Sequence, residues 1–309
     1  MNENIINFRG DALLDSDAIV LQELESLLNE RFKLVRQIRR GMRLSFTIDN
    51  FRISGLAIYK VKINELPDSI GNLNKLKKFH LVGNMMEIKN AFGLKKLPDS
   101  IGNLEMLEDL YLFGNDISIL PDSIGKLKNL ECLNLSGNFL KELPESIGGL
   151  KSLKVLRLRW NELKSLPESI GDLKKLKFLH LGCNQIGSLP DSIGYLRSLR
   201  ILYLFDNHLY SLPESIGNLF SLELLNLCSN RVKSLPESIG NIRSLLELDL
   251  SDNNISSLPE SIGYLKSLRM LRLYEIPLIS IPKSIENLKK QGTIITNLYI
   301  RDYLKDSKS

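Results

Sequence analysis

One phrase recurs along most of this sequence with a period of 23 residues. It reads Leu-x-x-Leu-x-Leu-x-x-Asn and runs, for example, from Leu107 to Asn115 and from Leu130 to Asn138. A fixed period of this length is typical of stacked repeats, because so short a unit cannot bury its apolar side without a neighbour. The chain is therefore expected to fold as a solenoid, and its 309 residues do not require two globular domains.

Each repeat predicts a short strand and a helical return. The Leu-x-Leu part has the two-residue period of a β-strand, and strands in register form a parallel sheet. The Asn side chain has two donors and an acceptor, so a ladder of Asn residues should bind the backbone where each strand turns away. The second phrase, Leu143 to Leu150, reads Leu-Pro-Glu-Ser-Ile-Gly-Gly-Leu. Pro suits the first turn of a helix, the acid complements the helix dipole, and Gly ends the turn. Since helices are wider than strands are apart, the sheet should be concave.

The repeats divide the chain into three expected parts. Residues 1–52 form an N-terminal cap, residues 53–288 form a solenoid of ten repeats, and residues 289–309 form a C-terminal cap with a polar tail. The first and tenth repeats are degenerate: Val61 stands where later repeats have Asn, and Pro277 interrupts the last repeat. Degenerate end repeats are typical of solenoids, whose terminal units cap the core.

The N-terminal cap is predicted to contain a helix and a hairpin. Apolar residues at helical spacing predict a helix with Ser16 or Asp17 as N-cap and an end near Asn29. Its core side is expected to consist of Val20, Leu21, Leu24, Leu27 and Leu28. Residues 1–12 look poorly tied down, whereas residues 44–53 alternate around a turn and predict a hairpin that covers the first strand edge.

Three further segments carry weaker signals. A basic run, residues 31–43, contains Arg31, Lys33, Arg36, Arg39, Arg40 and Arg43; it is either a solvated face or a contact for an anionic membrane or RNA. Eight extra residues near 86–93 are either a drifted surface loop or a functional one. Residues 285–304 are expected to close the core with Ile294, Ile295, Leu298, Tyr299 and Leu304.

The cysteines and the amino end favour a cytoplasmic protein. Cys132, Cys183 and Cys228 lie two repeats apart, which is about 10 Å by strand spacing and beyond the roughly 7 Å that a disulfide allows. Free thiols are typical of a reducing compartment. The amino end lacks the basic start and apolar run of a secretory signal, and no stretch approaches the ~18 apolar residues that span a bilayer.

The repeat resembles that of leucine-rich repeat proteins, specifically the intracellular 23-residue class with Leu-Pro-x-x-Ile-x-x-Leu return segments. The resemblance covers Ile53 to about Leu288. Similar repeats occur in Ras-group leucine-rich repeat proteins, in Ras-pathway scaffolds and in prokaryotic intracellular proteins. The resemblance implies an α/β solenoid with 3-10 or helical returns on its convex face. It also implies that the concave face binds a protein partner, with small GTPases and signal transduction as one setting.

The outward strand positions are the expected binding surface. Large aromatic and Arg side chains, the usual anchors of protein interfaces, stand there in several repeats. The predicted partner-binding residues are Tyr111, Phe113, Arg157, Arg159, Trp160, His180, Tyr203, Phe205, Arg272 and Tyr274. Basic residues gather in repeats five to seven, while the carboxyl half carries Asp206, Glu223, Glu247, Asp249, Asp252 and Glu275. A face divided in this way suits a protein with an oppositely divided surface that accepts aromatic side chains.

Nucleic-acid binding, catalysis and self-assembly are the alternatives to protein binding. The basic cluster with Trp160 and Tyr203 could stack nucleic-acid bases, although a net charge of +5 does not by itself imply such a partner. Catalysis is disfavoured because His80, His180 and Asp249 lie in distant repeats and no phosphate loop or zinc motif is present. Self-assembly is a further alternative. We therefore predict a monomeric, non-catalytic interaction module or scaffold without cofactor or metal.

Overall fold

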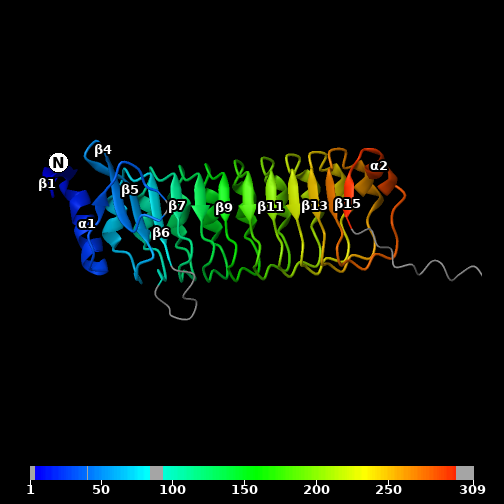
Figure 1. Cartoon of the computed structure of the whole chain (residues 1–309), viewed down its shortest axis with the longest axis horizontal. Coiled ribbons are helices and arrows are strands. Elements are labelled where there is room, and N and C mark those ends of the chain that lie inside the picture. The colour runs from blue at the N-terminus through cyan, green and yellow to red at the C-terminus, as the bar shows by residue number, and fades with distance from the viewer. Residues whose placement is uncertain (1–3, 40, 84–92, 297–309) are drawn as a thin grey trace, which may run out of the picture. The chain divides into compact units, whose positions relative to one another are not determined.

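The computed structural model describes residues 4–39, 41–83 and 93–296. It consists of two compact units, Met1–Asn161 (unit 1) and Glu162–Ser309 (unit 2), and several of the strands are labelled in Figure 1. The predicted insertion up to residue 92, Arg40, and the C-terminal residues Leu298, Tyr299 and Leu304 lie outside the described residues.

In unit 1 the strands of the large sheet follow one another in chain order. They are β3 (Lys33–Leu34), β4 (Leu44–Asp49), β5 (Arg52–Tyr59), β6 (Lys78–Val82), β7 (Asp109–Tyr111), β8 (Cys132–Asn134) and β9 (Val155–Arg157). The β4–β5 pair is the predicted antiparallel hairpin. From β5 onward the pairing is parallel, and Leu110, Leu133 and Leu156 are aligned across neighbouring strands. The equal repeat length therefore keeps every strand in register.

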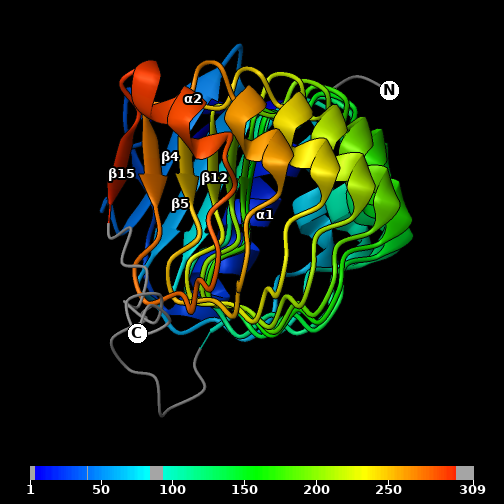
Figure 2. The ribbon, with the colours of Figure 1, turned by 90° about the vertical axis from the view of Figure 1, so that its right-hand side faces the viewer.

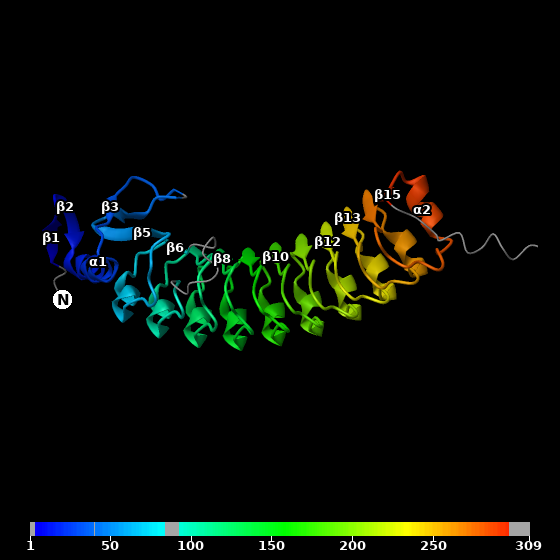
Figure 3. The same cartoon turned by 60° about the horizontal axis from the view of Figure 1, so that its bottom comes forward.

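Unit 2 continues the same pattern with strands β10 (Phe178–His180), β11 (Ile201–Tyr203), β12 (Leu224–Asn226), β13 (Glu247–Asp249), β14 (Met270–Arg272) and β15 (Ile294–Thr296). All neighbouring pairs from β10 to β15 are parallel. The row of strands follows the inner side of this unit's curve and the helical returns its outer side (Figure 3). This arrangement confirms the leucine-rich-repeat solenoid expected from the sequence.

The C-terminal cap differs from the prediction. Ile294 is 58% exposed, because it belongs to an additional strand, β15, that pairs with β14. The core is closed instead by α2 (Ile285–Lys290), whose Ile285 and Leu288 are buried. This helix packs against the last 3-10 helix, in the place of a further return (Figure 2).

The returns are 3-10 helices of five residues. They are η1 (Asp68–Asn72), η3 (Asp99–Asn103), η4 (Asp122–Lys126), η5 (Glu145–Gly149), η6 (Glu168–Asp172), η7 (Asp191–Tyr195), η8 (Glu214–Asn218), η9 (Glu237–Asn241) and η10 (Glu260–Tyr264). The Pro before each helix is the N-cap and has an extended backbone, as at Pro213 with φ −70° and ψ 153°. The acid follows it in the first turn.

The repeated Gly has a different role from the one predicted. It does not end the helix in a left-handed conformation. A Cβ on Gly102 would lie 2.6 Å from the carbonyl oxygen of Ser123, and one on Gly171 would lie 2.5 Å from that of Ser192. Gly is therefore required because the backbone of the next 3-10 helix passes directly over it.

The core consists of the repeated Leu and Ile side chains and is bordered by the Asn ladder. In unit 2, Asn207 is 5% exposed. Its Nδ2 donates to the carbonyl oxygens of Leu181 and Leu204, both at 3.0 Å, and its Oδ1 accepts from the N–H of Ile186 at 3.0 Å. One side chain thus satisfies backbone groups of two successive repeats, as the ladder prediction requires.

The amino end is better ordered than predicted. Strands β1 (Ile5–Phe8) and β2 (Asp11–Leu14) form an antiparallel hairpin, so the expectation that this end is poorly tied down is wrong for residues 5–12, while residues 1–3 lie outside the described residues. Helix α1 (Asp15–Leu28) has Leu14 as N-cap and Asn29 as a left-handed C-cap with φ 51°. Asp17 is fully buried instead of capping the helix, because its carboxylate accepts hydrogen bonds from the Arg52 side chain and from the N–H of Ile53.

The structure corrects one further part of the N-terminal prediction and adds detail to the basic run. Leu27 is 51% exposed and does not join the core side of α1, since the helix buries a narrower stripe than the sequence indicated. Within the basic run, Arg43 forms an ion pair with Glu30, and Lys33 and Leu34 pair with β4.

Candidate functional site

The structure places the ten predicted binding residues in two groups, each within one unit. Unit 1 holds Tyr111, Phe113, Arg157, Arg159 and Trp160, and unit 2 holds His180, Tyr203, Phe205, Arg272 and Tyr274. Tyr111, Arg157, His180, Tyr203 and Arg272 stand in the strands, between buried Leu residues. Their partial exposure follows from the two-residue strand period.

A row of polar side chains crosses the strands of unit 1. The Tyr59 hydroxyl lies 3.1 Å from His80 Nδ1, and the His80 and Tyr111 rings are 4.6 Å apart. The Tyr111 hydroxyl accepts from Cys132 Sγ at 3.4 Å, and Arg157 Nη1 lies 3.8 Å from the same sulfur. We call these five residues the unit 1 row. The sequence prediction named only Tyr111 and Arg157, although the others occupy neighbouring outward positions.

Burial keeps most of the unit 1 row uncharged. Desolvation lowers the pKa of His80 to about 4, with a smaller contribution from Lys78. Desolvation also raises the pKa of Tyr111 to about 12 and raises the pKa of the Cys132 thiol. At neutral pH the imidazole, phenol and thiol are therefore neutral. The row presents hydrogen-bonding groups and one guanidinium, and its thiol is not activated as a nucleophile.

Arg159 and Trp160 form a pair at the end of β9. The Arg159 guanidinium carbon lies 3.7 Å from the centroid of the Trp160 ring, which is 41% exposed. The strand period does not place this ring outward, contrary to the sequence argument. Trp160 follows the strand in a left-handed bend with φ 58°, a conformation shared by Cys183 and Asp206 at the same repeat position. The bend turns the indole to solvent, and the guanidinium stacks on it.

An aromatic cluster occupies β10, β11 and the turn after them in unit 2. His180 lies 4.9 Å from the Tyr203 ring and 5.4 Å from the Phe205 ring, and Phe178 lies 5.8 Å from Tyr203. We call Phe178, His180, Tyr203 and Phe205 the unit 2 aromatic cluster. All four are partly exposed, and rings at these separations stabilise one another in edge-to-face and tilted arrangements. Phe178 was not among the predicted site residues, although it lies two positions before His180 on the same strand side.

Gly182 makes room for this cluster. A Cβ at Gly182 would lie 2.7 Å from carbon atoms of the Phe205 ring, so the ring rests directly on the backbone. The N–H of Gly182 also donates to His180 Nδ1 at 3.2 Å. A residue that the repeat pattern treats as variable therefore holds two rings of the cluster in place.

Arg272 and Tyr274 do not join the aromatic cluster. They belong to the repeat of β14, which β12 and β13 separate from β11. Arg272 Nη1 lies 3.2 Å from Glu247 Oε2, and the N–H of Tyr274 donates to Ser251 Oγ at 3.3 Å. We call the face of each unit that is formed by the outward side chains of the strands its strand side. Arg272 and Tyr274 line a separate part of the strand side of unit 2.

Ion pairs reduce the basic character predicted for repeats five to seven. Lys154 Nζ lies 2.6 Å from Glu131 Oε1, and Arg200 Nη2 lies 2.6 Å from Glu223 Oε1. Both pairs are partly exposed, so they contribute little to stability. They nevertheless offset two of the cations on which a nucleic-acid surface would depend.

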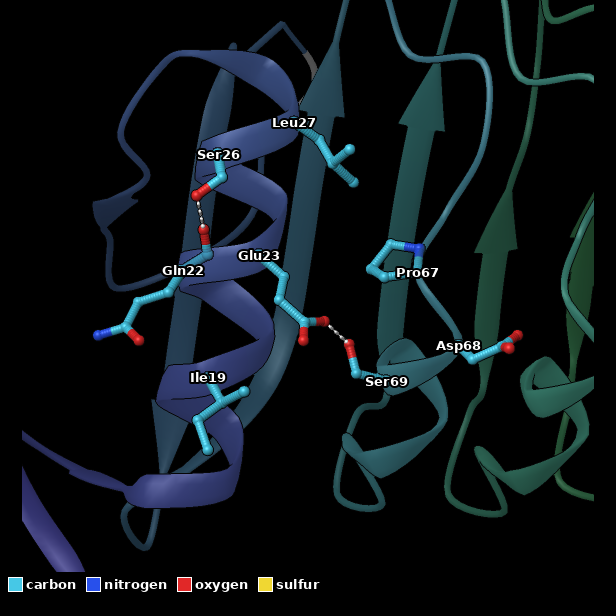
Figure 4. Close-up of a pocket in the computed structure, with 8 residues that line it drawn as sticks. All are labelled: Ile19, Gln22, Glu23, Ser26, Leu27, Pro67, Asp68 and Ser69. Carbon is cyan, nitrogen blue, oxygen red and sulfur yellow. Dashed lines mark hydrogen bonds between the residues drawn. The ribbon is translucent and has the colours of Figure 1, made fainter.

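A hollow beside α1 is a further surface feature of unit 1 (Figure 4). It encloses about 610 Å³ and is lined by Ile19, Gln22, Glu23, Ser26, Leu27, Pro67, Asp68 and Ser69. The Ser69 hydroxyl donates to the Glu23 carboxylate across it. The exposed Ile19 and Leu27 lie eight residues apart on α1; the sequence prediction assigned Leu27 to the core side of the helix and did not include Ile19.

The described parts of the chain contain no group of three or more His, Cys, Asp or Glu residues positioned to hold a metal ion. Across residues 4–39, 41–83 and 93–296, no helix has the length and apolar character needed to cross a bilayer.

Comparisons with solved structures give the same fold. A leucine-rich repeat protein of Leptospira interrogans is 34% identical with a TM-score of 0.72, and the match covers 86% of this chain and 70% of that one. A TDR receptor is 27% identical with a TM-score of 0.66, covering 78% of this chain and 42% of the receptor chain. A chain of the Toll–Spatzle complex of Drosophila is 25% identical with a TM-score of 0.64, covering 74% and 31%. This chain thus spans less than half of the latter two. A comparison with curated protein sequences gave no match.

Family models match most of the repeat region. The model described as a leucine-rich repeat region matches residues 133–211 and 207–294, and the model of two leucine-rich repeats matches residues 105–148. Together with the identity to the Leptospira protein, these matches show that the chain belongs to the leucine-rich repeat family.

Proposed function

We propose that this protein is a non-catalytic scaffold that binds a protein partner through the strand side, with the unit 2 aromatic cluster as its anchor. The observation that carries the proposal is the fixed arrangement of Phe178, His180, Tyr203 and Phe205, whose rings contact one another while remaining partly exposed. Such rings lose little conformational entropy on binding, and Tyr is among the residues enriched in interface hot spots. Proteins of this repeat family generally mediate protein interactions, which supports the same function.

The Arg159–Trp160 pair is proposed as an independent anchor in unit 1. The stacked guanidinium and indole are already held against each other. Binding of a partner therefore costs less side-chain conformational entropy. A partner surface with acidic groups would complement Arg157 and Arg159 here. The unit 1 row adds neutral hydrogen-bonding groups beside them.

We infer the cellular setting from the cysteines and from the resemblance of the repeats. The free thiols of Cys132, Cys183 and Cys228 support a reducing, cytoplasmic location. Small GTPase signalling is proposed on the resemblance of the repeats to Ras-group proteins alone. We propose a monomer, with Arg272 and Tyr274 as additional contacts at the C-terminal end of the strand side.

The test compares matched aromatic substitutions in unit 2. A protein captured by the wild type is purified, and its affinity is measured by titration calorimetry for Tyr203→Ala and Tyr210→Ala. Tyr210 is also a surface Tyr of unit 2, 51% exposed, but it lies beyond the strand and contacts Arg231. We expect Tyr203→Ala to weaken binding at least tenfold, about 1.4 kcal/mol or more, and Tyr210→Ala to leave it unchanged. Equal affinities for the two variants would refute the proposal that the unit 2 aromatic cluster anchors the partner.

A spectroscopic test addresses unit 1. Trp160 is the only Trp in the chain, so its emission reports on that surface directly. We expect a bound partner to shift this emission, and Trp160→Ala to weaken binding at least tenfold while the melting temperature stays nearly constant. Glu168→Ala, on the 3-10 side, should leave the affinity and the Trp160 emission unchanged. An emission spectrum that stays unchanged at saturation would remove Trp160 from the interface.

A further inference from the structure

One edge of unit 2 carries a row of cations and aromatic side chains that the strand-side proposal does not use. It is the edge where each 3-10 helix leads into the next strand. The residue after the closing Leu or Ile of each helix is exposed there, and these residues are Lys174, Arg197, Phe220, Arg243 and Lys266. Tyr195 and Tyr264, the last residues of η7 and η10, stand two positions earlier on the same edge. We call these seven residues the basic edge.

Contacts between successive repeats show that members of the row are neighbours. Lys174 Nζ lies 4.8 Å from the centroid of the Tyr195 ring. The Ser244 hydroxyl donates to the carbonyl oxygen of Phe220 at 2.8 Å, which stacks the segment that holds Arg243 on the segment that holds Phe220. Phe220 and Arg243 also line a common shallow hollow of about 340 Å³. Cations and rings therefore alternate in chain order along this edge, and the contacts join two neighbouring pairs of them.

The aromatic members of the basic edge are strongly exposed. Tyr195, Phe220 and Tyr264 have exposures of 56%, 56% and 61%. At Phe220 an aromatic ring occupies the position where the neighbouring repeats have a Lys or Arg. Single exposed apolar residues are common on protein surfaces, but three large rings flanked by four cations on one edge form a patch with a definite chemical character.

The opposite edge of unit 2 has a mixed charge. There the strand ends lead toward the next Pro, and the acids Asp206, Asp252 and Glu275 offset the exposed cations Lys164, Arg231 and Lys233. That edge also carries one cation–ring contact, between Arg231 and the exposed Tyr210. The basic edge differs in charge, because its four cations adjoin one exposed acid, Asp172.

We propose that the basic edge binds the surface of a membrane that contains anionic lipids. Lys and Arg near such a surface are attracted to its negative potential, and Tyr and Phe rings are stable at the level of the headgroups. The edge combines both groups in a line that a flat surface can contact along its length. A single-stranded nucleic acid is instead bound along a positively charged groove with bases stacked on the rings, whereas these side chains stand on an outer edge.

The experiment measures partitioning of the full chain onto vesicles by sedimentation. One set contains equal parts of phosphatidylserine and phosphatidylcholine, and the other contains phosphatidylcholine alone. The test variant is the double substitution Arg197→Gln with Arg243→Gln. Its control is Arg231→Gln with Lys233→Gln, which removes the same charge from the opposite edge. A third variant, Phe220→Ser, removes one ring.

We expect the wild type to bind the phosphatidylserine vesicles and not the neutral ones. Each lost cation should weaken partitioning about fivefold, so the test variant should bind about 25-fold more weakly. The control variant should remain close to the wild type, because its charges lie away from the membrane. Phe220→Ser should weaken binding at constant net charge. Urea midpoints equal to that of the wild type confirm that the variants are folded.

Two results would overturn the proposal. Equal partitioning of the test and control variants would show that only net charge matters. Binding of the wild type to a mixed-sequence single-stranded RNA, with no partitioning onto phosphatidylserine vesicles, would assign the edge to nucleic acid. Neither result bears on the unit 2 aromatic cluster, which is tested separately through Tyr203.

Discussion

The Asn ladder leads to a quantitative prediction at Asn207. In Asn207→Ala, the carbonyl oxygens of Leu181 and Leu204 lose a donor and the N–H of Ile186 loses its acceptor. An unsatisfied buried polar group costs about 1 to 3 kcal/mol. The two carbonyl oxygens keep other donors, because Leu181 O also accepts from Asn184 Nδ2 and Leu204 O from Asn230 Nδ2, both at 2.9 Å. Only the N–H of Ile186 loses its partner, so we expect a loss of about 1 to 3 kcal/mol in the free energy of unfolding.

The assay is urea unfolding followed by circular dichroism, with Asn218→Ala as the matched control. Asn218 ends η8 and its side chain is exposed, so its removal should shift the urea midpoint very little. The slope of the transition should stay constant for both variants if the repeats unfold together. A midpoint shift for Asn207→Ala no larger than that for Asn218→Ala would show that the ladder does not stabilise the fold.

Three further predictions concern stability. Asp17→Ala leaves the buried Arg52 without its carboxylate and should lower the free energy of unfolding by about 3 to 5 kcal/mol in a urea titration. Gly171→Ala should lower the melting temperature through a loss of about 1 to 3 kcal/mol, because its Cβ would meet the next 3-10 helix, whereas Gly187→Ala, where a Cβ meets no atom within 4 Å, should not. The pKa of His80 is about 4 in the folded chain and near 6.5 when unfolded, so its stabilising effect is complete above pH 6.5 and is lost as the pH falls toward 4. The wild type should therefore lose about 2 kcal/mol more than His80→Asn over that interval, and equal losses would contradict the assignment.

The repeat period made the solenoid predictable from the sequence. A strand period of two and a fixed repeat length leave few ways to bury the Leu residues, and the register across Leu202 and Leu225 follows directly. The role of the Asn side chain could also be derived, because its donors and acceptor match the backbone groups at a strand end. These features depend on local residue patterns and on their repetition, both of which can be recognised in the sequence alone.

The departures have a common physical cause, which is contact between segments that the repeat pattern does not describe. Asp17 is a residue type that favours the N-cap position, but its carboxylate instead forms an ion pair with the buried Arg52 of the β4–β5 hairpin. The repeated Gly is a residue type that favours helix ends, but Gly is required here because a Cβ would clash with the backbone of the next repeat. In both cases the local preference was outweighed by a partner distant in sequence.

In the candidate site, too, the sequence predicted which residues face outward but not which of them contact one another. The strand period correctly identified His180, Tyr203 and Phe205 as outward residues, yet it could not show that their rings contact one another. That contact depends on Gly182, where the Phe205 ring lies on the backbone, and on the addition of Phe178 from the start of the same strand. A substitution at Gly182 would leave every repeat-defining Leu and Asn in place and still displace the ring. The identity of a binding surface in such a solenoid is therefore set at the variable positions, where one repeat is fitted to the next.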